Sequence, residues 1–170
     1  MANIFFIFFS GICACCAMDL WQQFLERMFK APATNWGIVG RWFLILIKEK
    51  KIFIPSVVNE PSLKYEVFYG WIVHYCVAIL YSLVFWMLAY FFLLLPIGFF
   101  GGLIFGVLSV IVPWFFFMPC LGNGILARNT DNPFRACMLA LASHSVFGMS
   151  LGTVWSIFFT NLWILVAFFC

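Results

Sequence analysis

Three ionisable side chains lie inside segments that are otherwise apolar enough to cross a bilayer: Asp19, His74 and His144. A charge or an imidazole in hydrocarbon is costly, so such residues usually face a bundle interior, a partner or a water-filled cavity. A carboxylate beside two imidazoles can relay a proton, because histidine titrates near neutral pH and a nearby carboxylate adjusts that titration. The same groups suit a divalent metal such as iron, zinc or manganese, and they can also hydrogen-bond helices together.

These interpretations stay open at the level of sequence. The first is a polar layer that handles a proton or a small cation. The alternative is a non-catalytic membrane scaffold or assembly protein in which the layer is a packing clamp, and a lesser alternative is a divalent-metal site at Asp19, His74 and His144. No helix supplies two of these three ligands at i and i+3 or i+4, so spacing does not favour the metal, and no cofactor is predicted.

The composition indicates an integral membrane protein. Hydrophobic residues make up 66% of the 170 residues and charged residues only 9%, whereas soluble domains carry about a quarter charged residues. A crossing needs roughly 20 apolar residues. The fold class expected is therefore all-α, a bundle of four transmembrane helices in one membrane domain (1–170), with spans at about 4–25, 67–95, 97–121 and 136–169.

The distribution of basic residues predicts the topology. Seven of the nine Lys and Arg lie between the first and second spans, and the other two, Arg128 and Arg135, lie between the third and fourth. The positive-inside rule then puts loops 26–66 and 122–135 in the cytoplasm and both termini outside. The expected partners are the lipid bilayer and either a second copy or another membrane protein, and no nucleic acid. The first span lacks a basic n-region, so we expect a retained helix rather than a signal peptide.

Two helix starts are predicted outside the main spans. Residues 36–47 are apolar but too few to cross, which favours a short amphipathic helix in the interface, capped by Thr34 or Asn35; a re-entrant segment is the second choice. In the last loop, Thr130 or Asp131 is expected to begin the final helix before Pro133.

Small residues four apart mark the faces on which membrane helices approach closely. Such stripes contain Gly11, Cys15 and Asp19 in the first span, Gly70 and His74 in the second, Gly98, Gly102 and Gly106 in the third, and His144, Gly148 and Gly152 in the fourth. Pro113 is expected to kink the third span.

Counting from charged boundaries places the ionisable residues at one depth. Asp19 lies seven residues before Glu26, His74 eight after Glu66 and His144 nine after Arg135, which is roughly 10 to 14 Å inside. Supporting residues are expected on the cytoplasmic side: Arg41, Arg135, Asn123 and Asn129. Enzyme activity finds little support, because no GxSxG or HExxH motif appears.

Several short motifs, in order, resemble one family. They include Met18-Asp19-Leu20-Trp21, Val39-Gly40-Arg41-Trp42, Gly70-Trp71 with His74-Tyr75, Val112-Pro113, Met118-Pro119 and His144 with Val146-Phe147-Gly148. This series resembles an uncharacterised bacterial inner-membrane family, domain of unknown function 2938, over about residues 11–151. The resemblance implies a small four-helix protein of the bacterial cytoplasmic membrane and supplies no activity.

Overall fold

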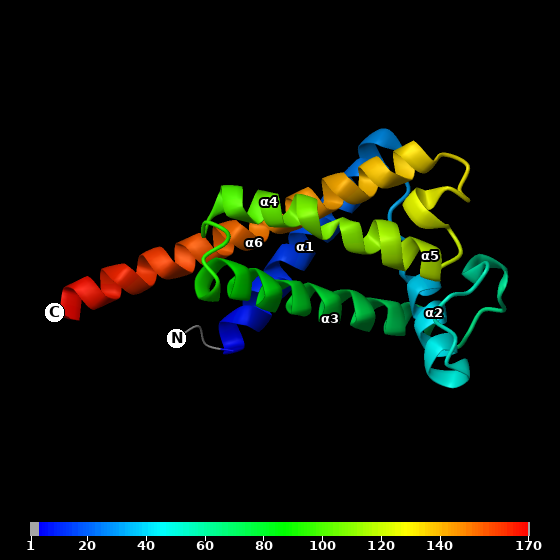
Figure 1. The fold of residues 1–170 in the computed structure, drawn as a ribbon, viewed down its shortest axis with the longest axis horizontal. Helices are drawn as coiled ribbons and strands as arrows, with labels where there is room; N and C mark the ends of the chain where they lie inside the picture. The colour runs from blue at the N-terminus through cyan, green and yellow to red at the C-terminus, as the bar shows by residue number, and fades with distance from the viewer. Residues whose placement is uncertain (1–3, 170) are drawn as a thin grey trace. The chain divides into compact units, whose positions relative to one another are not determined.

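The structure, a computed structural model, describes residues 4–169 for the backbone and 4–160 for side chains, and its regular elements there are all helical. Its helices are α1 (Ile4–Phe29), α2 (Trp36–Glu49), α3 (Glu66–Trp86), α4 (Phe99–Ser109), α5 (Met118–Cys120) and α6 (Pro133–Phe169) (Figure 1). No strand occurs within residues 4–169. The predicted all-α class is thereby confirmed.

Four helices are long and apolar enough to cross a membrane, as the composition predicted. They cover Ile4–Phe29, Glu66–Phe91, Phe99–Cys120 and Pro133–Thr160. The shortest has 22 residues, which at 1.5 Å per residue gives about 33 Å, a little more than the hydrocarbon thickness.

The helix ends differ from the expected spans at the connection between α3 and α4. The second span was expected to reach residue 95 and the third to begin at 97. Instead, α3 continues as a π-helical turn, Met87–Phe91, and α4 begins only at Phe99. Leu93 and Gly98 have φ values of 55° and 134°, which end the helix and turn the chain, so residues 92–98 form the connection.

Two helix starts are fixed by asparagine side chains. Asn35 caps α2 by accepting a hydrogen bond from the Gly37 amide (3.0 Å), which agrees with the expected start of this helix. At α6 the expected initiators were Thr130 or Asp131. The cap is instead Asn132, whose Oδ1 accepts from the Arg135 amide (3.0 Å), with Pro133 in the first turn.

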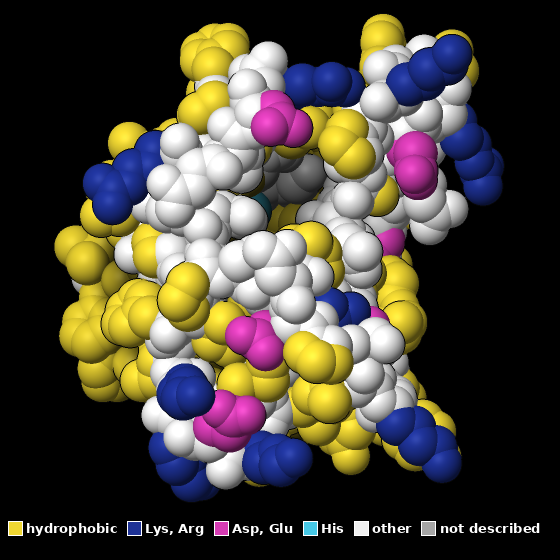
Figure 2. Space-filling model, turned by 90° about the vertical axis from the view of Figure 1, so that its right-hand side faces the viewer, with side chains coloured by type: hydrophobic (Ala, Val, Ile, Leu, Met, Phe, Trp, Pro, Cys, Tyr) yellow, Lys and Arg dark blue, Asp and Glu magenta, His cyan; other side chains and the backbone are white. Residues whose placement is uncertain are grey.

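The described residues form two compact units, and the division cuts across α1, α3, α4 and α6. Unit 1 comprises residues 4–21, 78–108 and 143–169, and unit 2 comprises residues 22–77 and 109–142. All nine Lys and Arg and five of the six acidic residues belong to unit 2, so Asp19 is the only charged side chain of unit 1. Figure 2 faces the end that carries α2 and α5, where basic and acidic side chains lie scattered among apolar ones.

Unit 1 is held together by backbone contacts at glycines. A β-carbon at Gly102 would overlap the Gly148 carbonyl oxygen and lie 2.8 Å from the Gly152 amide nitrogen, and one at Gly11 would lie 2.9 Å from the Cα of Ile79. Such approach is the usual basis of helix association in lipid. The Ser10 and Ser82 hydroxyls, both fully buried, lie 2.7 Å apart between α1 and α3.

Unit 2 is built around the crossing of α2 and α3. A β-carbon at Gly40 would overlap the Glu66 carbonyl oxygen, and one at Gly70 would overlap the Trp36 carbonyl oxygen. α2 is therefore docked on the first turns of α3. A small core of buried residues lies beneath it: Trp42, Ile45, Ile54, Val57 and Cys120.

The helix that includes Pro113 departs from regular α geometry. A proline has no amide hydrogen to donate, and here the chain forms a π-helical turn over Pro113–Phe117 before α5. The carbonyls that follow at the end of α5 are satisfied by another segment of unit 2. The Ile54 amide donates to the Cys120 carbonyl (3.2 Å) and the Val57 amide to the Leu121 carbonyl (3.3 Å).

Candidate functional site

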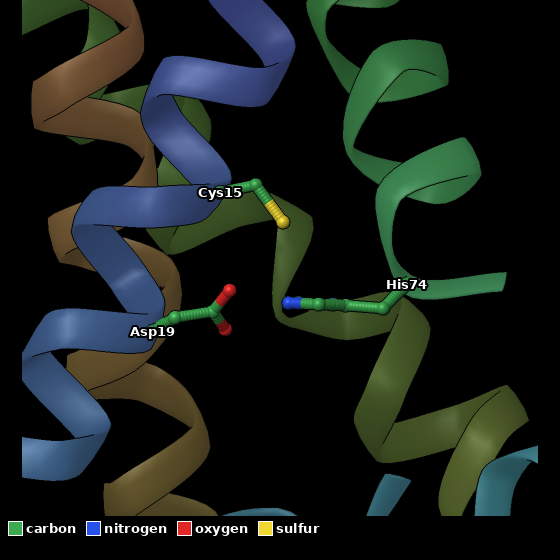
Figure 3. A group of neighbouring side chains, drawn as sticks. All are labelled: Cys15, Asp19 and His74. Carbon is green, nitrogen blue, oxygen red and sulfur yellow. The ribbon is translucent and has the colours of Figure 1, made fainter. Parts of the chain in front are cut away.

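Two side chains with reactive groups, a thiol and a carboxyl group, project from the same side of α1 in unit 1. Cys15 is fully buried, and Asp19, one turn later, is partly buried (Figure 3). The spacing of four residues puts a thiol and a carboxylate on one helical face. The Cys15 thiol therefore lies on the same helix face as Asp19, although the predicted layer of Asp19, His74 and His144 did not include it.

His74, on α3 in unit 2, is buried at 6% exposure and surrounded by aromatic rings (Figure 3 draws its side chain). Trp36 of α2 stacks on the imidazole, with ring centroids 3.7 Å apart and planes 25° apart. Trp71 and Tyr75, its neighbours on α3, lie 5.7 and 5.4 Å away. Gly70 makes this stack possible, because its missing side chain lets the Trp36 backbone reach α3 one turn before His74.

His144, on α6, belongs to unit 1. Its ring meets that of Tyr81 edge-on at 5.9 Å, and its carbonyl oxygen packs against Gly106, where a β-carbon would overlap it. Tyr81 also contacts Phe105 and Phe147 at 6.0 Å. His144 is therefore embedded in an aromatic and glycine environment of α3, α4 and α6.

The three residues expected in one layer are thus divided between the units. Asp19 and His144 belong to unit 1, and His74 belongs to unit 2. Tyr81, the ring partner of His144, lies seven residues beyond His74 on α3, about 10 Å of helix rise. That the three share one layer stays a prediction.

Metal-ligating chemistry is available from three of these side chains. Cys15, Asp19 and His74 each offer one ligand atom: a thiol sulfur, a carboxylate oxygen and an imidazole nitrogen. Sequence reasoning missed Cys15 as a ligand, although its place four residues before Asp19 was already visible as part of the small-residue stripe. Trp36 could not be found in this way, because its contact with His74 depends on how α2 docks.

Arg41 is the centre of a polar network in unit 2. Its Nε donates to Oε2 of Glu66 (2.8 Å) and its Nη2 to Oε1 (2.9 Å), a two-point ion pair. Its Nη1 donates to the Glu60 carbonyl (2.7 Å), and Glu66 also accepts from the Leu63 amide (2.8 Å). The hydrogen bond to Glu66 raises the pKa of Arg41 above its ordinary value. Arg41 therefore joins α2, the loop after it and the start of α3.

The other supporting residues, which were expected on the cytoplasmic side, lie in the loop before α6 and in the first turn of α6, within unit 2. The side-chain Nδ2 of Asn129 donates to the Gly122 carbonyl (3.0 Å), and the backbone amide of Asn129 donates to the Asn123 carbonyl (2.9 Å). Arg135 donates from Nη2 to the Lys30 carbonyl (3.2 Å), which connects the start of α6 with the end of α1. These contacts close the loops around the ends of helices.

No curated protein and no solved structure matches the chain. A family model described as "Protein of unknown function (DUF2938)" matches residues 8–157, which cover α1 to most of α6. The resemblance seen in the short motifs is therefore confirmed, and the chain belongs to the DUF2938 family.

Proposed function

We propose that the protein is integral to the bacterial cytoplasmic membrane and handles a proton or a small cation at a polar layer formed by Asp19, His74 and His144. The four apolar helices and the collection of all nine basic residues in unit 2 support a membrane location with unit 2 at the cytoplasmic surface. The lipid bilayer is then the partner of the exposed apolar side chains.

The observation that carries the proposal is the stack of Trp36 on His74. A protonated imidazole over the face of an indole is attracted by the ring quadrupole, which offsets part of the cost of a charge in an apolar site. Such a stack suits a charged as well as a neutral imidazole within an otherwise apolar helix.

Other titratable groups would share this work. Asp19 contributes a carboxyl group from α1, with Cys15 one turn away, and Tyr75 adjoins His74 on α3. His144 with Tyr81 supplies a second imidazole in unit 1.

The alternative of a scaffold without substrate receives less support from the packing. In that alternative the glycine faces bind another membrane protein. Gly102 and Gly106 are instead in backbone contact with Gly148 and His144 of the same chain. Those faces are occupied within unit 1.

The stack provides its own test. A protonated imidazole quenches an indole in contact with it, so the fluorescence of Trp36 is expected to fall between about pH 8 and pH 5, the range in which histidine titrates. The signal is obtained by subtracting the spectrum of a Trp36→Phe variant, because the chain has eight tryptophans. The protein is studied in detergent micelles or nanodiscs.

Two variants make the result specific. His74→Gln is expected to abolish the pH-dependent difference, and Asp19→Asn to change its midpoint. Trp71→Phe removes a more exposed ring that does not stack face-on and is expected to leave the response in place. A Trp36 signal that is independent of pH, in protein of native helical content, contradicts proton handling at His74.

A further inference from the structure

We propose that residues 47–53, at the end of α2 and directly after it, bind the headgroups of anionic phospholipids at the cytoplasmic surface of the membrane. We call these residues the lysine segment. The inference goes beyond proton handling and rests on the membrane location in the proposed function. Its ligand is a lipid with a phosphodiester headgroup and acyl chains beside it, such as phosphatidylglycerol.

The lysine segment combines cations with apolar side chains on the surface of unit 2. All seven of its residues are exposed. It contains three lysines and one glutamate, which give a net charge of +2, and the glutamate, Glu49, is paired with Lys51 (2.8 Å). Ile47, Ile52 and Phe53 are 52%, 45% and 63% exposed. The segment therefore offers both a positive charge and an apolar surface to a partner.

The backbone beneath these side chains is held in place by unit 2. α2 ends at Lys50, which has a left-handed conformation (φ 59°) and whose amide donates to the Leu46 carbonyl (3.0 Å). The indole Nε1 of Trp42 donates to the Ile52 carbonyl (2.8 Å), and Ile54, which follows the segment, is buried in the core beneath α2. The exposure of the lysine segment is therefore a feature of a fixed backbone.

The docking of α2 places the lysine segment at the membrane boundary. Gly40 packs against the carbonyl of Glu66, the first residue of α3, and Arg41 is paired with the Glu66 carboxylate. α2 lies across the start of α3 (Figure 1). A helix that lies across the end of a membrane-spanning helix runs along the membrane surface, so the residues at its own end stay near the level of Glu66.

The headgroup region suits this mixture of side chains better than water or hydrocarbon does. Isoleucine and phenylalanine are unfavourable in water, and lysine is unfavourable in hydrocarbon. At the boundary the apolar side chains enter the edge of the acyl region while the lysine ammonium groups reach the phosphates. Anionic lipids of the cytoplasmic leaflet attract lysines that lie next to membrane-spanning helices. The net positive charge of the segment is complementary to such headgroups.

The test places an indole in the lysine segment by the substitution Phe53→Trp, which the interface tolerates well. The full chain is studied in phosphatidylcholine nanodiscs that contain a small, equal fraction of either brominated phosphatidylglycerol or brominated phosphatidylcholine. Because the chain has eight tryptophans, the spectrum of the protein without the substitution is subtracted. We expect stronger quenching by the brominated phosphatidylglycerol. Equal quenching by both lipids, or quenching by neither, overturns the inference.

Two pairs of substitutions on the Phe53→Trp background locate the charge that is responsible. Lys48→Gln with Lys50→Gln is expected to lower the preference for phosphatidylglycerol about 25-fold, or about fivefold for each lysine. Arg27→Gln with Lys30→Gln removes the same charge from another exposed part of unit 2 and is expected to keep the preference. An equal loss in both pairs would indicate general attraction by the charge of unit 2 and overturns the site.

A competitor without acyl chains tests the lipid assignment. Soluble glycerol phosphate is expected to leave the quenching unchanged, because it makes no contact with Ile52 or with the side chain at position 53. Relief of quenching by this competitor would assign the segment to a free phosphate ester and overturns the lipid site.

The same nanodiscs separate this inference from the proposed function, because the Trp36 pH response is measured in them as well. If that response is present and the preference for phosphatidylglycerol is absent, only the lipid site fails. If the preference is present and the Trp36 signal is independent of pH, only proton handling fails.

Discussion

Arg41 and Glu66, 25 residues apart in the chain, form a two-point ion pair with N–O distances of 2.8 and 2.9 Å. Their side chains are only 13% and 16% exposed, so the pair is screened less than a surface pair. The same guanidinium also donates to the Glu60 carbonyl. One side chain thus fixes α2, the loop behind it and the first turn of α3.

Replacement of Arg41 by Lys is expected to destabilise the protein by about 2 kcal/mol. An ammonium keeps the charge but cannot make the two-point contact and reach a carbonyl at once. The value lies below the 3–5 kcal/mol for breaking a fully buried pair, because this one is partly exposed. The measurement is the free energy of unfolding in mixed micelles.

Lys51→Gln provides the matched control, since Lys51 and Glu49 form an exposed pair at 2.8 Å. It is expected to leave stability unchanged, and an equal loss in both variants would contradict the role given to Arg41.

The raised pKa of Arg41 sets the pH range over which its ion pair stabilises the fold. A cation whose pKa is higher in the folded state contributes stability below its unfolded pKa, so the contribution of the Arg41 charge is expected to be constant through neutral pH and lost under strongly alkaline conditions.

Gly70→Ala is expected to separate α2 from α3. Its β-carbon would overlap the Trp36 carbonyl oxygen, and overpacking of this kind typically costs 1–3 kcal/mol. Because Trp36 stacks on His74 from the same turn, the pH response of its fluorescence is expected to weaken as well. Gly37→Ala, where the nearest atom is the Asn35 side-chain oxygen at 3.1 Å, is expected to have the smaller effect. Equal effects would show that the docking does not depend on Gly70.

The hydroxyls of Ser10 and Ser82 are expected to be coupled by about 0.6 kcal/mol, the average for hydrogen bonds between helices of a membrane protein. Ser82→Ala leaves the Ser10 hydroxyl bonded to the Phe6 carbonyl (2.8 Å), so the loss from this change alone is expected to be modest. A double-mutant cycle in the same unfolding assay measures the coupling. Purely additive effects would contradict a direct bond.

The proposed orientation predicts which positions react from each side of the membrane. On a background without native cysteines, Cys introduced at Lys50 or Asn132 is expected to react with an impermeant maleimide only after the membrane is opened. Cys at Leu94, which is 69% exposed in the α3–α4 connection, is expected to react in intact spheroplasts. Labelling of the Lys50 position in intact spheroplasts would contradict the proposed orientation.

The helices were predictable because their length and apolar content depend only on local sequence. The start of α2 at Asn35 was predictable for the same reason, since a cap acts within three residues. The end of α3 was not: the π-helical turn Met87–Phe91 and the positive φ of Leu93 interrupt an apolar run that has no charge to mark its limit.

The surroundings of the candidate site could be predicted only in part. Periodicity placed Asp19 and His74 on small-residue faces, because a face follows from spacing along one helix. It could not show that Trp36 covers His74, since that contact depends on the approach of two helices at Gly40 and Gly70. Arg41 was expected near the cytoplasmic ends, but its partner Glu66 follows from tertiary packing.

The α3–α4 connection, residues 92–98, contains no charged side chain. In the proposed orientation this is the only loop that has to be carried through the bilayer during insertion. Its passage moves no ionised group across the hydrocarbon and is not opposed by the membrane potential. The opposite arrangement would require nine cationic side chains to cross, which favours the proposed orientation at the stage of insertion, before helix packing contributes.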